Sequence, residues 1–175
     1  MLMNLLNLDE NIRALMLEEI DFDIDRTKLY INHRLNLIGK RSYPLLLKDS
    51  AQSHDDLWLA HQMRLKQLLN ATEPRKLKDR TIQVKVPDDA NVVLAEDDFN
   101  RFYMRALCLY AINNKILSLK VYRAKQVHHS HPQSVRKIGK LISPKELLDD
   151  LRQHVGENGH MGIGDTGSGL SVMIP

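Results

Sequence analysis

The first third of the chain has the apolar periodicity of amphipathic helices. Asn7 and Glu10 have the spacing of a capping box, which predicts that a helix begins there. Its apolar face comprises Ile12, Leu15, Met16 and Ile20. Ser53 and Asp56 have the same spacing and predict another helix that runs to about Asn70. The apolar stripe of that helix comprises Leu57, His61, Leu65 and Leu68.

The sequence between and after these two helices is less regular. Residues 27–31 fit a short strand or a turn. Gly39 and Pro44 then interrupt the apolar pattern, so residues 26–52 are predicted to form a broken helical segment. Residues 73–80 are charged, contain a proline and have no apolar period, which predicts a linker between two lobes.

Beyond the linker, strand and helix patterns alternate. Residues 81–86 alternate apolar and polar side chains, as a half-exposed strand does. The strongest helix is predicted over residues 96–113, with an apolar stripe formed by Phe99, Phe102, Tyr103, Ala106, Leu109 and Tyr110. Residues 117–124 fit a second strand. Ser143 and Glu146 form a capping box and predict a last helix.

These elements predict an α+β protein in four parts. A helical region (1–72) and the charged linker (73–80) precede a small βαβα lobe (81–155), and an extended glycine-rich arm (156–175), either flexible or docked on a partner, follows. Two strands are too few for a stable sheet, so we expect the lobe to borrow strands, in one interpretation from another subunit. The arm ends in apolar residues at strand spacing, which favours docking on a partner by strand addition. Its candidate docking residues are Ile163, Leu170, Val172 and Ile174.

Composition narrows the class of protein. The chain of 175 residues is 43% hydrophobic and 27% charged, values typical of globular proteins. The single cysteine, Cys108, lies between two leucines, which predicts a core position and a reducing compartment. The apolar N-terminus lacks a basic segment, and no stretch approaches about 20 apolar residues. We therefore expect neither a signal peptide nor a membrane span.

Positive charge is concentrated in one stretch of the chain. Residues 115–145 contain eight lysines and arginines and no acidic residue, although the net charge of the whole chain is only +3. This stretch predicts either a solvated face or a contact with DNA or an acidic partner. The candidate contact residues are Lys120, Arg123, Lys125, Arg136, Lys137 and Lys140. Arg101 and Arg105 either extend this surface or pair with the adjacent acids Asp97 and Asp98.

Other motifs give weaker indications. The glycine pattern at residues 162–167 has no helix after it that could hold a nucleotide phosphate. The acids at 21, 23 and 25 resemble the start of a calcium loop, but the glycine and the final glutamate of such a loop are missing. His128, His129 and His131 are too close together to make a metal site alone. We find no catalytic motif, so the sequence predicts no catalytic residue, metal or cofactor, and an enzyme with a dispersed active site is only a third interpretation.

Three segments carry a resemblance. LAEDDFNRFYMRALC (94–108), VYRAKQV (121–127), and KELLDDLR (145–152) followed by the terminal SGLSV resemble uncharacterised proteins of tailed bacteriophages and prophages. The resemblance implies a virion structural protein, either a head-to-tail connector or neck component or one associated with the capsid. It would be made in the host bacterial cytoplasm and would assemble with other virion proteins or copies of itself, near packaged DNA and without a membrane. The alternative is a phage-encoded DNA-binding or regulatory protein that uses residues 115–145.

Overall fold

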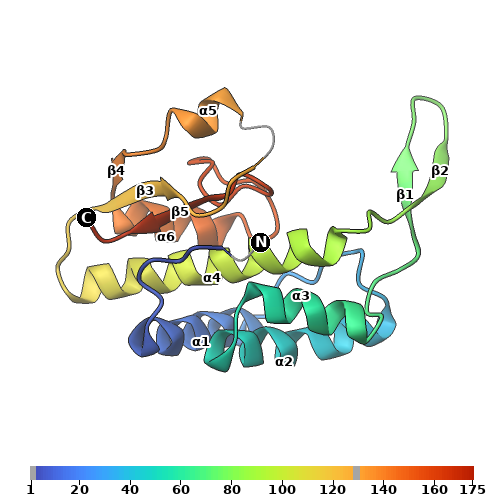
Figure 1. Ribbon diagram of the computed structural model, residues 1–175, viewed down its shortest axis with the longest axis horizontal. Coiled ribbons are helices and arrows are strands. Elements are labelled where there is room, and N and C mark those ends of the chain that lie inside the picture. The colour runs from blue at the N-terminus through green and yellow to red at the C-terminus, as the bar shows by residue number, and fades with distance from the viewer. Residues whose placement is uncertain (1–2, 128–130) are drawn as a thin grey trace.

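A computed structural model describes residues 3–127 and 131–175 and confirms the α+β class (Figure 1). The described helices are α1 (Glu10–Asp25), α2 (Leu37–Ser53), α3 (Asp56–Leu65), α4 (Ala90–Asn113), α5 (Pro132–Val135) and α6 (Pro144–Gln153). The described strands are β1 (Thr72–Lys76), β2 (Thr81–Lys85), β3 (Leu119–Arg123), β4 (Leu141–Ile142) and β5 (Leu170–Met173). Within the described ranges, no helix has both the length and the hydropathy needed to cross a bilayer.

Helix α4 lies at the centre of the molecule. Figure 1 shows α1, α2 and α3 on one side of it, and α6 with the sheet of β3, β4 and β5 on the other. Of the predicted aromatic stripe, Phe99, Phe102, Tyr103 and Ala106 are buried in the core, and Leu109 and Tyr110 are partly buried against it. The helix begins at Ala90, six residues earlier than predicted. The two layers therefore share one continuous core around α4.

The C-terminal residues complete the sheet of their own chain. β5 pairs antiparallel with β3 through Val172↔Val121 and Ser171↔Tyr122, and β4 pairs with the other edge of β3. Ile163, Leu170 and Val172 are buried in the chain's own core, and Ile174 packs against it. Residues 170–173 therefore form a strand of the chain's own sheet, where the sequence predicted an extended arm over residues 156–175. An apolar alternation signals a strand, but it does not show which sheet edge the strand joins.

The helix starts of the N-terminal region differ from the prediction by two residues. The side chain of Asp9, rather than Asn7, caps α1 by accepting a hydrogen bond from the Ile12 N–H at 2.9 Å. Asp55 caps α3 in the same way, while Ser53 is the last residue of α2. Any acid or amide near a helix start can serve as its cap, so capping-box spacing alone did not choose among them.

The buried face of α3 also differs from the predicted stripe. Leu59, Ala60 and Met63 face the core, whereas Leu57 and Leu65 are 52% and 65% exposed. Apolar residues occur on both sides of this helix, so periodicity could not identify the inner side. The outer leucines remain available for contact with another molecule.

Helix α2 is continuous through both residues that were predicted to break it. Pro44 lies inside the helix and removes one backbone hydrogen bond, which normally disfavours helix by about 3 kcal/mol. Burial of Tyr43, Leu46 and Leu47 on the same helix offsets this cost. Gly39 lies directly against the backbone of Leu68, so its lack of a side chain permits close packing.

The tight contact at Gly39 gives a testable prediction. A Cβ atom at position 39 would overlap the carbonyl oxygen of Leu68, so Gly39→Ala should lower the free energy of unfolding by about 1–3 kcal/mol. Urea denaturation measures the change, and Lys40→Ala at the exposed neighbouring position is the control. Equal midpoints for both variants would contradict the close approach.

Residues 73–80 form an ordered hairpin where an irregular linker was predicted. They supply most of β1 and the turn into β2, and the register runs from Thr72↔Lys85 to Lys76↔Thr81. The strand predicted over residues 81–86 is confirmed as β2. Backbone pairing with β2 holds β1 in place, although β1 itself lacks apolar alternation.

Candidate functional site

The strongest polar cluster of the interior surrounds Arg105 on α4. Its guanidinium donates to Glu19 Oε2 at 2.6 Å and to the two carboxylate oxygens of Asp23 at 2.6 and 2.8 Å. All three side chains are at most 2% exposed. The sequence had suggested that Arg105 either extends a basic surface or pairs with Asp97 and Asp98. The structure shows neither arrangement. Arg105 joins α4 to α1.

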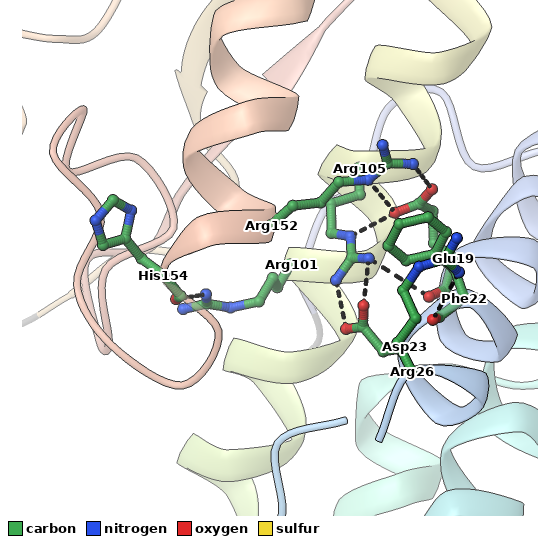
Figure 2. Close-up of polar contacts among 8 residues, drawn as sticks. All are labelled: Glu19, Phe22, Asp23, Arg26, Arg101, Arg105, Arg152 and His154. Carbon is green, nitrogen blue, oxygen red and sulfur yellow. Dashed lines mark hydrogen bonds and ion pairs between the residues drawn. The ribbon is translucent and has the colours of Figure 1, made fainter. Parts of the chain in front are cut away.

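Arg152 extends this cluster to α6 (Figure 2). It pairs with Glu19 and lies over the ring of Phe22, with 4.4 Å between its guanidinium carbon and the ring centroid. Burial raises the pKa of Glu19, but hydrogen bonds from Arg152 and the charge of Arg105 outweigh it, so the net pKa is lowered. Glu19 is therefore a charged structural link among three helices.

Arg101, one turn before Arg105, holds the chain that follows α6. Its guanidinium donates to the backbone oxygen of His154, as Figure 2 shows. It also donates to the backbone oxygen of Glu157. The carboxylate of Asp150 on α6 also holds this segment, because it accepts hydrogen bonds from the backbone N–H groups of His160 and Met161 at 2.9 and 3.1 Å. These contacts order the glycine-rich segment that leads to β5.

Two carboxylates in the N-terminal half of α4 have raised pKa values. Burial raises the pKa of both Asp97 and Asp98 to about 6. Tyr43 donates its hydroxyl hydrogen bond to Asp98, and the backbone N–H of Gly167 donates to Asp97 at 3.2 Å. The cavity beside them is about 90 Å³, well below the roughly 300 Å³ of typical ligand pockets. We therefore assign Asp97 to packing of the glycine-rich segment and Asp98 to the contact between α4 and α2.

A larger polar cleft lies between α5 and the glycine-rich segment. It encloses about 380 Å³ and is lined by residues that include Ser134, Lys137, Asn158 and Asp165. One carboxylate oxygen of Asp165 is buried without a hydrogen-bond partner among the described residues. The cleft has the size of a small-molecule site, but its lining is mainly polar, whereas typical sites are lined mainly by apolar side chains.

The six basic residues singled out in the sequence divide into two groups. Lys120, Arg136 and Lys140 are exposed. The other three bind the chain itself. Arg123 donates to the backbone oxygen of Ser168, Lys137 donates to that of Gly162, and Lys125 pairs with Glu96. Half of the predicted DNA-contact set therefore holds the C-terminal segment and α4 in place.

The acidic, histidine and cysteine residues singled out in the sequence have structural roles where the structure describes them. Asp21 pairs with Lys48 at 2.8 Å, and Asp23 with Arg105. The side chain of His131 caps α5, while His128 and His129 lie outside the described residues. Across the described part of the chain, no three His, Cys, Asp or Glu side chains form a group able to hold a metal ion. Cys108 is buried as predicted, and burial raises the pKa of its thiol.

The surface has an apolar face on the helical pair α2–α3, here called the α2–α3 face. Its large exposed side chains, with their exposed fractions, are Leu37 (75%), Ile38 (69%), Leu45 (64%), Leu57 (52%) and Leu65 (65%). Asn36 hydrogen-bonds the backbone oxygens of Gln67 and Leu68, so the end of α3 lies at the start of α2. Exposed apolar residues concentrated on one pair of packed helices are typical of protein contact surfaces.

The comparisons with known proteins identify no relative. No family model matches the chain, and no curated protein and no solved structure matches it significantly.

Proposed function

We propose that the chain is a structural protein of a tailed-phage virion, as a head-to-tail connector or neck component or in association with the capsid. The α2–α3 face carries this proposal, because it exposes five large aliphatic side chains on packed, ordered helices. In the segments quoted above, the resemblance to phage proteins points to the same class. The protein would be made in the host bacterial cytoplasm and incorporated into the particle.

The charges around the α2–α3 face favour a contact with a different surface of a second copy. Exposed Lys40, Arg41, Arg64 and Lys66 lie among its apolar residues, so two such faces would repel each other across a two-fold axis. The exposed acids of α1 provide a complementary surface; they are Glu10, Glu18 and Asp25. Such a head-to-tail contact can close into a ring, which suits a connector.

The mass of the protein in solution tests this proposal. Over a concentration series, the full chain should form oligomers in sedimentation velocity, and the double variant Leu37→Ser with Leu45→Ser should remain at the 20.2 kDa of one chain. The matched control replaces two exposed leucines elsewhere, Leu117→Ser with Leu141→Ser. A monomeric full chain, or equal oligomers for all three proteins, would contradict assembly through this face.

The alternative, a DNA-binding or regulatory protein that uses residues 115–145, keeps some support. Lys140 precedes β4 and lies near Lys120 of β3, because Lys120 pairs with Leu141 and the Val121 N–H donates to the Lys140 backbone oxygen. Exposed Arg136 adds a third cation. This set is half of the predicted one, so we rank the alternative second.

A further inference from the structure

The β1–β2 hairpin projects from the body of the molecule. Figure 1 shows it standing clear of the helices at one end of α4. Five residue pairs join its strands, so its paired part extends roughly 17 Å at 3.3 Å per residue. Only Glu73, Ile82 and Val84 are even partly buried within the two strands. A hairpin with so few contacts has little role in the core.

The base of the hairpin is nevertheless fixed to the body. Arg34 binds Glu73 through two hydrogen bonds, Nε to Oε2 at 2.6 Å and Nη2 to Oε1 at 2.9 Å. Where the two strands join the body, the N–H of buried Val86 donates to the backbone oxygen of Ala71 at 3.1 Å. These contacts orient the hairpin as an arm, since an isolated two-stranded hairpin is only marginally stable.

The tip of the arm is strongly basic. Residues 75–80 contain four cations and one anion, Asp79, and all are exposed. The cations are Arg75, Lys76, Lys78 and Arg80. Among the described residues, none of these four takes part in an ion pair. Glu73 is already paired with Arg34, so it does not neutralise the tip.

The register gives the arm one almost wholly polar face. The pairs Thr72↔Lys85, Pro74↔Gln83 and Lys76↔Thr81 share that face, because paired residues of antiparallel strands point the same way. The side chains of threonine, glutamine and lysine are common donors to DNA phosphates. The opposite face carries the partly buried Ile82 and Val84.

We propose that the β1–β2 hairpin is a contact arm for duplex DNA. A two-stranded ribbon fits the major groove, which is about 12 Å wide, and the unpaired cations of the tip match its flanking phosphates. The inference goes beyond the proposed virion role and uses a different surface, so either can fail alone. It also uses different residues from the basic stretch at 115–145.

Fluorescence anisotropy with the full chain and a labelled 30-base-pair duplex tests the proposal at two salt concentrations. The tip variant carries Arg75→Ala, Lys76→Ala, Lys78→Ala and Arg80→Ala. Removing four phosphate contacts should weaken binding at least about tenfold and reduce the slope of log affinity against log salt by about 3 to 4. The matched control removes the exposed cations of the other stretch through Lys120→Ala, Arg136→Ala and Lys140→Ala.

The outcomes separate the proposals. The arm proposal is supported if the full chain and the control variant both bind DNA in a salt-sensitive way and the tip variant loses this binding. The tip variant must also keep the melting temperature of the full chain. The arm proposal is overturned by a full chain that does not bind, by a tip variant that binds equally, or by loss in the control variant alone. None of these outcomes alters the oligomer test of the α2–α3 face, which is measured without DNA.

Discussion

Replacing Arg105 with methionine should lower the free energy of unfolding by about 3–5 kcal/mol, the usual cost of removing one partner from a buried ion pair. Arg105→Met retains a long side chain but leaves the carboxylates of Glu19 and Asp23 buried without their main partner. Urea denaturation at neutral pH measures the loss. The control is Arg26→Met, because Arg26 is exposed at the end of α1 and lies over the ring of Phe22 on that helix. A loss below about 1 kcal/mol for Arg105→Met would contradict the role of the cluster.

The same variant should show a defined pH dependence. The pKa of Glu19 is lowered in the folded chain, so its ion pairs stabilise the fold above its ordinary value of 4.5. This contribution is lost as the pH falls through the lowered folded pKa. The difference between Arg105→Met and the parent chain should therefore be largest at neutral pH and should shrink in acid.

Deleting residues 170–175 should prevent stable folding. The deletion removes β5 and the buried side chains of Leu170 and Val172, each worth about 2–5 kcal/mol by analogy with core truncations. It also leaves Asn100 without Leu170 O and Ser171, its two hydrogen-bond partners. The summed loss is comparable to the whole stability of a domain, which is about 5–15 kcal/mol.

Dispersion of amide proton resonances measures the effect of this deletion. The full chain should give a dispersed spectrum and the 1–169 chain a collapsed one. Removing Pro175 alone is the control, because that residue is exposed and follows the last strand. A folded 1–169 chain with an unchanged melting temperature would restore the interpretation of the C-terminus as a separate arm.

The sequence predicted those elements whose signals were strong and local. In α6, the hydroxyl of Ser143 accepts from the Glu146 N–H, as the capping box required. Helix α4 was predicted from its apolar and aromatic residues, although packing between two layers buries nearly all of its sides rather than a single stripe. The hairpin was missed because β1 is charged and carries Pro74, so only its pairing with β2 defines it.

The interior charges were harder to predict because their partners are distant in sequence. Arg105 and Glu19 are separated by 86 positions. One signal was present: Glu19 lies on the same helical face as Ile12 and Met16, and an acid on a buried face requires a buried cation. No comparable signal showed that Lys137 turns inward, because its acceptor is the backbone oxygen of Gly162.

Mass spectrometry of purified particles tests the proposed virion role most directly. Tailed particles would be purified on a density gradient from a lysate of a host that carries the gene. The account predicts that peptides of this chain co-purify with the particles at a fixed ratio to the major capsid protein, and that Leu37→Ser with Leu45→Ser abolishes their incorporation. Abundant protein in the lysate with none in intact particles would contradict it.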